Sequence, residues 1–445
     1  MLSRIVFPLR QQIRNARHCQ NITEIQVLTS RTACSSCAAT YGNRDRSRPT
    51  DYNNSAILPE NKFVTVKSSF PRCLSSEAAI TAIEKRDRYL ELHHEGQVFT
   101  IPYMWLRDHC RCSHCFNEET GQKNVSHKIS GIGASGVELE EFGTTLKILW
   151  EDGHKTEYSV QWLVDNSYST ESKKKTIPLL WDSAKIHSEP MPVVDYESYK
   201  TSETGIRETM YNLLRYGFSV VEGVPTSPQD TEEVVLNLNF VEETLFGKMF
   251  YIMPNNERPD TAYTNTELGA HNDTCYFTAP IGVMALHCLM HDGTGGETLL
   301  VDGFQVAEKL RQEDPAAFTN LTNQIVPHEY VEEGFHIHSH GRVLTIHPAS
   351  KEMENIRFNP YDMAPLDTIP PNEVEQFYKD YKKLTKLIYD PANSFWFKLH
   401  PGMLVFINNW RVLHGRASFT GKRVLSGAYI PYHDWMSKAR VAGLV

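Results

Sequence analysis

The sequence lacks the features that define several large classes of protein. Its 445 residues contain no apolar run near the roughly 18 residues that a membrane-spanning helix needs, so we expect no membrane partner. Basic residues are not in excess, since the net charge is −9, which argues against broad binding to nucleic acid. Internal repeats are absent as well. With 40% hydrophobic and 22% charged residues, the composition is typical of a soluble globular protein.

The sequence also lacks the evenly dispersed cysteines of a disulfide framework. It has nine cysteines, an odd number, and three of them, Cys110, Cys112 and Cys115, lie close together. In so long a chain, clustered cysteines favour metal binding over disulfides. The pattern indicates a reducing compartment.

Acidic residues are missing from the first 22 positions, where four arginines occur, and Glu24 is the first acid. An Arg-rich, acid-poor and amphipathic segment predicts a mitochondrial presequence, with a disordered basic tail as the alternative. We expect residues 1–74 to comprise this presequence and a disordered segment. The Cys34 and Cys37 pair in that segment is expected to be inert.

Residues 75–180 have the pattern of a small β-rich domain. Strand-like stretches flank His94-Glu95-Gly96, and a second pair brackets Asp152-Gly153, so two hairpins are predicted. A domain with so few core residues often needs a metal. Three clustered thiolates and one histidine would form a closed, structural zinc site. The spacing leaves the histidine open among His109, His114, His127 and His154.

A second domain, residues 190–445, follows a polar connection that spans residues 165–192. Helical periodicity predicts helices over 205–216, 231–246 and 374–389. Short strands are expected from 275 onward, the last of them at 404–407 and 425–429. The pattern predicts a mainly β fold with flanking helices, of the double-stranded β-helix (jelly-roll) type.

His271 and Asp273 are two residues apart, so on a strand both side chains would project from one face. His414, near the end of the chain, could complete a set of two imidazoles and one carboxylate. That set leaves half of an octahedron open and is typical of non-haem Fe(II) oxygenases. A rival cluster without a carboxylate consists of His336, His338 and His340.

An oxidising iron enzyme needs an electron source, and 2-oxoglutarate is one that chelates the metal. Its far carboxylate would need a bidentate anchor, for which arginine is suited. Arg423 follows His414 by nine residues, near a strand expected to return past the site. A surface salt bridge is the alternative role for Arg423.

Four long stretches carry a family resemblance. They are YMWLRDHC at 103–110, DTAYT at 260–264, GTGGETLLVDGF at 293–304 and NWRVLHGR at 409–416. Together they resemble the TauD-like 2-oxoglutarate oxygenases, and among these the carnitine-biosynthesis hydroxylases, over roughly residues 89–445. The resemblance implies Fe(II) at His271, Asp273 and His414, 2-oxoglutarate on Arg423, and ascorbate as a reductant. It also selects His154 as the ligand that joins Cys110, Cys112 and Cys115 on zinc.

The substrates of these hydroxylases, trimethyllysine and γ-butyrobetaine, share a trimethylammonium group. Such a group cannot donate a hydrogen bond, so aromatic faces hold it. The positions that match the family's aromatic cage are Phe246, Phe250, Tyr263 and Tyr429. Relatives have Tyr and Trp where this chain has Phe246 and Phe250, and phenyl rings attract cations less than indole does.

The other end of the substrate separates the two hydroxylases. Trimethyllysine has an α-ammonium beside its carboxylate, whereas γ-butyrobetaine has the carboxylate alone. By resemblance, Asp260 stands where an α-ammonium would bind, and Asn359 is a candidate for the substrate carboxylate.

We therefore expect a mitochondrial matrix enzyme that hydroxylates trimethyllysine at C3, with O2 and 2-oxoglutarate as cosubstrates. The family makes a homodimer plausible. Two alternatives are hydroxylation of γ-butyrobetaine and a non-catalytic protein that binds trimethylated lysine. An intact iron triad with Arg423 argues against the non-catalytic alternative.

Overall fold

The computed structural model describes residues 80–124, 133–140, 143–166, 176–254, 258 and 260–445. The predicted presequence, the Cys34 and Cys37 pair, and His127 lie outside these residues. Within the described ranges, no helix is both long enough and apolar enough to cross a membrane.

Residues 80–166 form a small β-rich unit with its own core. Two three-stranded antiparallel sheets, in the orders β1-β2-β3 and β6-β7-β8, supply most of it. The elements are β1 (Ile80–Lys85), β2 (Tyr89–His94), β3 (Gln97–Pro102), α1 (Tyr103–Asp108), β4 (Phe116–Asn117), β5 (Gln122–Lys123), β6 (Ala134–Leu139), β7 (Thr145–Trp150), β8 (Lys155–Ser159) and α2 (Val160–Asn166). Both predicted hairpins are present, as β2-β3 and β7-β8. Leu90, Leu146 and Leu163 are fully buried in the core between these elements.

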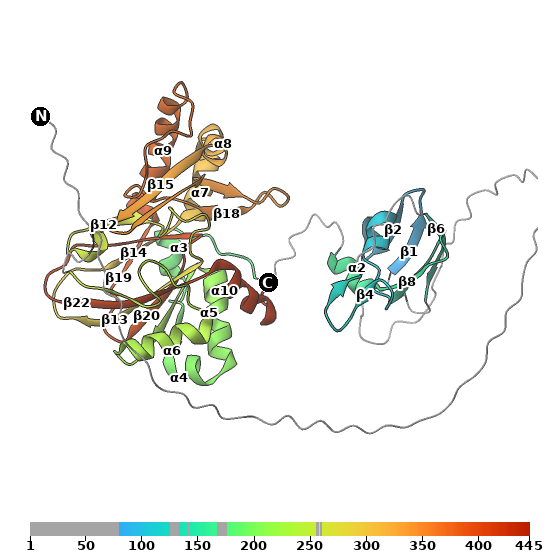
Figure 1. The fold of residues 1–445 in the computed structure, drawn as a ribbon, viewed down its shortest axis with the longest axis horizontal. Helices are drawn as coiled ribbons and strands as arrows, with labels where there is room; N and C mark the ends of the chain where they lie inside the picture. Colours follow the sequence, from blue (N-terminus) through green and yellow to red (C-terminus); the bar gives the residue numbers. More distant parts are fainter. Residues whose placement is uncertain (1–79, 125–132, 141–142, 167–175, 255–257, 259) are drawn as a thin grey trace, which may run out of the picture. The chain divides into compact units, whose positions relative to one another are not determined.

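Residues 176–445 contain two larger sheets (Figure 1). The six-stranded sheet has the order β11-β22-β13-β20-β10-β9, and the four-stranded sheet has the order β12-β21-β14-β19. The strands of the first are β9 (Val193–Asp195), β10 (Phe218–Glu222), β11 (Phe250–Ile252), β13 (Val283–His291), β20 (Met403–Asn408) and β22 (Arg423–Ile430). Those of the second are β12 (Leu268–His271), β14 (Thr298–Asp302), β19 (Ser394–Phe397) and β21 (Val412–Arg416).

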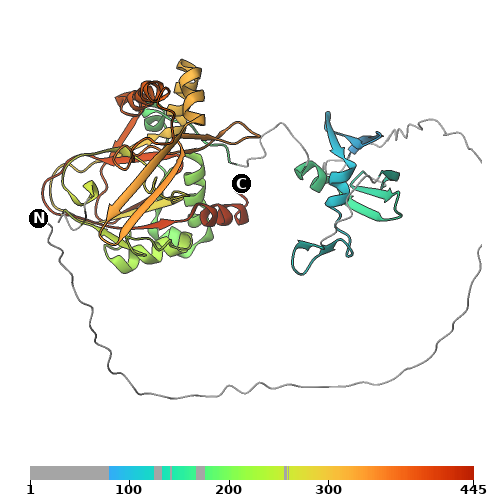
Figure 2. The ribbon, with the colours of Figure 1, turned by 45° about the horizontal axis from the view of Figure 1, so that its top comes forward.

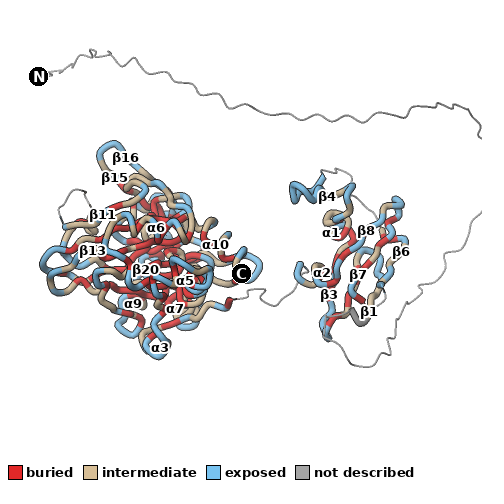
Figure 3. Tube along the Cα trace, turned by 90° about the horizontal axis from the view of Figure 1, so that it is seen from below, coloured by how far each residue is buried: buried red, intermediate tan, exposed pale blue. Residues whose placement is uncertain are grey.

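The central strand β20 shows how the layers are built. Its side chains alternate between two faces of the sheet, as the pleat requires. Leu404 and Phe406 point into a core that the sheet shares with helices. Val405 and Ile407 point into a second core, which also contains Leu300 of the four-stranded sheet. The two sheets therefore pack face to face, and β20 is buried on both sides (Figure 3).

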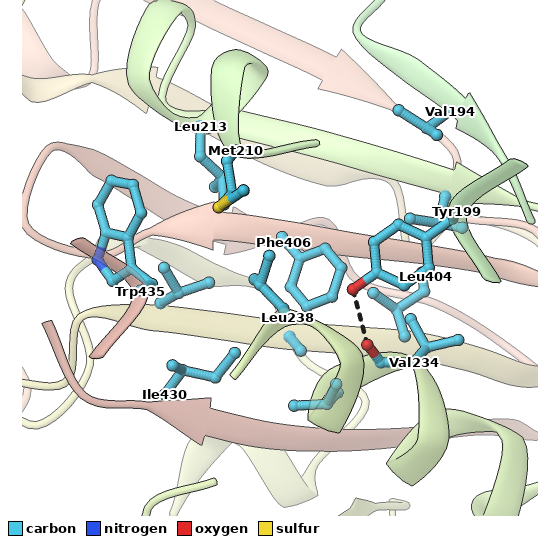
Figure 4. Packing of buried hydrophobic residues seen from close by; sticks show 14 of the residues in the cluster. Val194, Tyr199, Met210, Leu213, Val234, Leu238, Leu404, Phe406, Ile430 and Trp435 are labelled. Carbon is cyan, nitrogen blue, oxygen red and sulfur yellow. Dashed lines mark hydrogen bonds between the residues drawn. The ribbon is translucent and has the colours of Figure 1, made fainter. Parts of the chain in front are cut away.

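Helices cover the outer face of each sheet (Figures 1 and 2). The six-stranded sheet packs against α5 (Glu203–Arg215), α6 (Pro228–Leu238) and α10 (Tyr432–Val441), with Phe406 at the centre of their shared core (Figure 4). The four-stranded sheet packs against α7 (Gly303–Glu313), α8 (Pro315–Asn323) and α9 (Val374–Ile388). The remaining elements are α3 (Ser183–Ser188), α4 (Tyr196–Thr201), η1 (Thr261–Tyr263), β15 (Ile325–Glu332), β16 (Phe335–Arg342), β17 (Leu344–Ile346), β18 (Met353–Ile356) and η2 (Pro391–Asn393).

Some predicted boundaries differ from the structure. The helix predicted over 231–246 is α6, which ends at Leu238, because Asn239 leaves the helical conformation and donates its side-chain amide to the carbonyl of Asp434. The polar connection is shorter than expected. Thr176 already bonds to the carbonyl of Leu444, and Trp181 is buried.

Candidate active site and a second ligand cluster

The three residues predicted to bind iron converge at the edge of the four-stranded sheet. His271 is the last residue of β12, and it lies opposite His414 of β21 in the antiparallel register. Asp273 follows two residues later. Its Oδ1 is 3.3 Å from Nε2 of His271 and 3.5 Å from Nε2 of His414. Two histidines 143 positions apart in sequence are thus neighbours because their strands pair.

Asp273 does not lie on the strand, as the two-residue spacing had suggested, but in the turn that follows it. Thr274, the next residue, has a φ of 57°, which is rare for a β-branched residue and marks local strain. Asn409 holds this turn, since its side chain accepts from the amide of Asp273 at 2.9 Å and donates to the carbonyl of Asp273 at 3.0 Å. The backbone of Asp273 is therefore fixed by a residue from the β20-β21 loop.

The end of β12 is fixed by a close packing contact at Gly269. Its amide donates to the hydroxyl of Tyr361 at 2.8 Å. A Cβ at this position would lie only 2.5 Å from the hydroxyl of Tyr389 and 2.9 Å from that of Tyr361, so a larger residue would displace these side chains. The Gly269 carbonyl accepts from Nδ1 of His271 at 2.8 Å, which leaves Nε2 of His271 facing Asp273.

The charges of these three groups suit a cation. Burial alone would raise the pKa of the Asp273 carboxyl, but the His414 and His271 rings hold it well below its usual range. Burial lowers the pKa of His414, and the neighbouring His271 adds to this effect. For His271, burial opposes the charged form, but the hydrogen bond to Asp273, the charge of Asp273 and the bond to the Gly269 carbonyl together raise the pKa. An ionised carboxylate thus faces two imidazoles, and a dication would satisfy all three groups.

The donor positions fit an octahedral metal. Donors about 2.1 Å from one ion and at right angles to each other lie about 3 Å apart. The observed separations of 3.3 and 3.5 Å are close to this value. The second oxygen of Asp273, Oδ2, accepts from the hydroxyl of Tyr429 at 2.8 Å, so Oδ1 is left for a metal.

The rival histidine cluster is not assembled in the same way. His336, His338 and His340 lie on the exposed face of β16, and His336 contacts Glu329 at 3.1 Å. Among the described residues, only two groups of potential ligands bring their atoms within 4.8 Å of one another, and these histidines belong to neither.

All ten residues predicted to form the active site line one cavity of about 390 Å³. They are Phe246, Phe250, Asp260, Tyr263, His271, Asp273, Asn359, His414, Arg423 and Tyr429. The cavity also has lining residues that the sequence did not single out, among them Tyr276, Thr298, Tyr330, Asp362 and Arg416.

Three of the four predicted cage aromatics form one group. The rings of Phe250 and Tyr429 are 4.8 Å apart, and that of Phe246 lies 6.5 and 6.4 Å from them. Phe250 lies directly over Gly427, where a Cβ would meet its ring at 2.3 Å. The guanidinium of Arg258 is 5.1 Å from the centre of the Phe246 ring, so one face of Phe246 already contacts a cation. Tyr263 is buried and lines the cavity, but its ring is not among these pairs.

Two tyrosines that the sequence did not identify extend this aromatic group. Tyr330 on β15 lies 5.7 Å from Phe246 and 5.1 Å from Tyr276. Tyr276 could have been proposed, because it follows Asp273 by three residues. Nothing in the sequence marks Tyr330, which the β15-β16 hairpin brings to the cavity.

Arg423 and Arg416 both line the cavity, but only Arg416 uses its guanidinium for hydrogen bonds within the described residues. Arg416 donates to the carbonyls of Ala262, Thr264 and Thr266 at 2.7 to 3.2 Å. Arg423, the first residue of β22, is 4% exposed, and its Nε has no hydrogen-bond partner within the described residues. A buried cation without a counter-charge favours an anion beside it. Arg423 therefore fits the carboxylate of 2-oxoglutarate.

The two polar residues expected at the amino-acid end of the substrate differ in their bonding. Asp260 accepts from the amide of Ala262 through Oδ1, at 2.8 Å, and burial raises its pKa. Asn359 donates both amide hydrogens, to the carbonyl of Asn272 at 3.2 Å and to Asp362 at 2.6 Å. The amide group of Asn359 is thus already satisfied in this structure.

The second ligand cluster lies in the small unit. Sγ atoms of Cys110, Cys112 and Cys115 are 3.2, 3.6 and 3.7 Å from Nε2 of His154. In a tetrahedral zinc site, ordinary bond lengths place sulfur and nitrogen about 3.6 Å apart. The loop after α1 supplies the three thiols, and the β7-β8 turn supplies the imidazole. These four groups fit a closed zinc site.

The outer contacts of this cluster favour thiolates. Thr156 donates its hydroxyl to Cys110 at 3.3 Å, and Arg107 donates to Cys115 at 3.4 Å. Of the other histidines considered, His109 stacks on Trp105 with ring centres 4.3 Å apart and bonds to its carbonyl. His109 and His114 are therefore not part of the ligand group, which contains His154.

Comparisons with known proteins agree with this geometry. Residues 183–429 match the family described as "Taurine catabolism dioxygenase TauD, TfdA family", and residues 81–164 match "Gamma-butyrobetaine hydroxylase-like, N-terminal". The chain therefore belongs to the TauD family of dioxygenases. Its mainly β fold with flanking helices is confirmed, and the converging His-Asp-His donors support iron and 2-oxoglutarate as cofactor and cosubstrate.

Two relatives and one solved structure illustrate the similarity. The chain is 40% identical to "Trimethyllysine dioxygenase, mitochondrial" of Homo sapiens, over 87% of this chain and 94% of the relative. It is 32% identical to "Trimethyllysine dioxygenase" of Meyerozyma guilliermondii, over 77% and 90%. A taurine dioxygenase from Burkholderia xenovorans aligns with a TM-score of 0.42 and 16% identity, over 52% of this chain and 82% of that one.

Proposed function

We propose that this protein hydroxylates trimethyllysine at C3, using O2 and 2-oxoglutarate and releasing succinate and CO2. This would be the first step of carnitine biosynthesis. One observation carries the proposal: a single cavity places aromatic rings and part-buried carboxylates beside the His-Asp-His group. Aromatic faces suit a cation without N–H groups, and carboxylates suit one that has them. Trimethyllysine has both. The names of the relatives support the same substrate.

His271, Asp273 and His414 would hold Fe(II), and Arg423 would hold the far carboxylate of 2-oxoglutarate. Bound together, these two would activate O2: 2-oxoglutarate would supply two electrons as it becomes succinate and CO2, taking up one oxygen atom, and the other oxygen atom would be inserted into the substrate. The protein's contribution is to orient the donors. Tyr429 donates to Oδ2 of Asp273, and Gly269 fixes the tautomer of His271. The arrangement is therefore set before the substrate enters.

The aromatic group would hold the trimethylammonium. Phe246, Phe250 and Tyr429 form its centre, with Tyr263 lining the same cavity. Asp260 would face the α-ammonium. Asn359 would act indirectly at the amino-acid end of the substrate, because it donates a hydrogen bond to Asp362, which also lines the cavity.

The proposal is tested by incubating the purified protein with Fe(II), 2-oxoglutarate, ascorbate and either trimethyllysine or γ-butyrobetaine. A mass gain of one oxygen on trimethyllysine is expected. Turnover of γ-butyrobetaine alone would establish the alternative hydroxylase. Stoichiometric binding of trimethyllysine without oxygen insertion would establish a non-catalytic protein.

Replacing Arg423 by Lys should weaken the binding of 2-oxoglutarate. Lysine keeps the charge but loses the planar fork that matches a carboxylate in two hydrogen bonds. We expect the KM for 2-oxoglutarate to rise about tenfold or more, since each lost charge-assisted bond costs about 1.5–3 kcal/mol. Succinate formation at varied 2-oxoglutarate concentrations measures this. An exposed control, Arg342→Lys, should leave the KM unchanged, and an unchanged KM for Arg423→Lys would remove Arg423 from this role.

We also propose that Cys110, Cys112, Cys115 and His154 bind structural zinc, in a small domain (residues 75–180) that precedes the oxygenase domain (190–445). The sulfur–nitrogen distances and the closed ligand set support this. Because all four tetrahedral positions would be filled by protein, the metal would stabilise the fold and take no part in catalysis.

Three further properties belong to the proposal. A mitochondrial matrix location is supported by the composition of the first 22 residues and by the names of the animal relatives. Ascorbate would keep the iron reduced. A homodimer is proposed from the family, and light scattering of the purified protein would test it.

A further inference from the structure

Asp362 lines the active-site cavity and is held there by its backbone. Its carbonyl accepts from the amide of Glu329 on β15 at 2.8 Å, and the amide of Ala364 donates to the carbonyl of Pro327 at 3.0 Å. His328 and Met363 form an antiparallel bridge between the same segments. The segment after β18 is thus attached to β15, the strand that also brings Tyr330 to the cavity.

The carboxylate of Asp362 is poorly compensated. Within the described part of the chain it accepts one hydrogen bond, from Nδ2 of Asn359 at 2.6 Å, and it forms no ion pair. Asp362 is partly buried, and a carboxylate withdrawn from water usually has a cation or several donors, because its desolvation is unfavourable. Burial raises the pKa of Asp362 to about 7, in spite of the nearby His271 ring. The group therefore has unused acceptor capacity beside the cavity.

A second carboxylate, Asp260, lines the same cavity and is also partly satisfied. Its one hydrogen bond within the described residues comes from the amide of Ala262. The charge of Asp260 is among the causes that raise the pKa of Asp362, so the two groups repel each other across the cavity. A cation bound between them would relieve that repulsion.

Asn359 orients Asp362 rather than leaving its own amide for a ligand. Its two hydrogens go to Asn272 and Asp362, and its oxygen accepts from the amide of Tyr361 at 3.1 Å. To bind a substrate carboxylate, Asn359 would have to abandon Asp362. While the hydrogen bond from Asn359 to Asp362 is intact, Asp362 is the polar group of this segment that is available to a ligand.

We propose that Asp362 is a specificity-determining residue, which accepts hydrogen bonds from the substrate's α-ammonium and shares that group with Asp260. An ammonium has three N–H donors and can bridge two carboxylates, whereas the trimethylammonium end has none. Asp362 thus selects a substrate with a primary ammonium over one without it. This inference rests on the proposed function and adds a residue to it.

Asp362→Asn tests the proposal, because the amide oxygen still accepts from Asn359 while the charge is lost. The probes are trimethyllysine and its des-amino analogue, trimethylammoniohexanoate. Dissociation constants are measured by calorimetry on the protein loaded with Fe(II) and 2-oxoglutarate without oxygen, and kcat/KM is measured with oxygen. We expect Asp362→Asn to weaken trimethyllysine about 10- to 100-fold and the analogue less than about twofold.

The comparison of two probes in one variant separates specificity from folding, since a purely structural role would weaken both equally. Equal losses, or an unchanged preference for trimethyllysine, would overturn the assignment of Asp362. Glu329→Gln is the matched control: Glu329 also lines the cavity, but its carboxylate already contacts His336 at 3.1 Å, so its loss should keep the preference. If the wild-type protein binds and oxidises neither probe, the proposed function itself fails.

Discussion

An Asp273→Asn variant is expected to lose both iron binding and turnover. The substitution keeps the size of the side chain but removes the only negative charge among the three donors. It also replaces one carboxylate oxygen by an amide N–H. Oδ1 now lies 3.3 Å from Nε2 of His271, and Oδ2 accepts a hydrogen bond from Tyr429. Loss of an outer-shell partner costs a metal site about 10- to 100-fold in affinity or activity, and loss of a ligand should cost more.

Iron content after reconstitution, a titration of Fe(II) and the rate of succinate formation measure this effect. His338→Ala is the control, because it removes an imidazole from the exposed cluster on β16 and should change neither quantity. If His338→Ala lost the iron and Asp273→Asn kept it, the metal would lie at the cluster of His336, His338 and His340.

A Cys112→Ser variant is expected to lose zinc and to unfold the small unit formed by residues 80–166. Serine does not ionise near neutral pH and cannot replace a thiolate ligand. Structural zinc contributes roughly 10–16 kcal/mol to the folding of zinc-finger peptides. The core around Leu90 and Leu146 belongs to two three-stranded sheets, and so small a core contributes little stability on its own.

Zinc content and limited proteolysis measure this outcome. We expect less than one zinc per chain and new cleavage sites within residues 80–166, while residues 176–445 stay resistant. A Cys34→Ser, Cys37→Ser double variant is the control, since it removes a cysteine pair with the same spacing as Cys112 and Cys115 and should keep the zinc. Stoichiometric zinc in Cys112→Ser would contradict the three-cysteine site.

The residues predicted as metal ligands converge in the structure, and the sequence could single them out because ligand chemistry restricts residue type. Few residues other than His, Asp, Glu and Cys bind iron or zinc, so short spacings such as those of His271 and Asp273 are informative on their own. The details of the backbone were less predictable. Asp273 lies in a strained turn rather than on a strand, because Asn409, from a distant loop, holds that turn.

The substrate pocket was predicted only in part. Asp260 and Tyr263, which the family resemblance assigned to the substrate, lie shortly before His271 in the chain and line the same cavity. Tyr330 and Asp362 come from a hairpin and a loop far from the triad. Tyrosine and aspartate are common at surfaces and in cores, and without a spacing constraint nothing distinguishes these two from the others.

The sequence by itself pointed to a class of chemistry: it predicted a His-Asp-His group for iron, an arginine for 2-oxoglutarate, and a cysteine cluster for a second metal. These features depend on which functional groups are present and on short spacings, which the chain specifies directly. Only the tertiary structure decided which groups are free to bind a ligand. The side chain of Arg423 forms no hydrogen bond within the described residues, whereas both terminal nitrogens of Arg416 donate to backbone carbonyls. The amide of Asn359 is satisfied, whereas the carboxylate of Asp362 is not. Hydrogen-bond partners come from distant segments, so their allocation is settled only when those segments pack together.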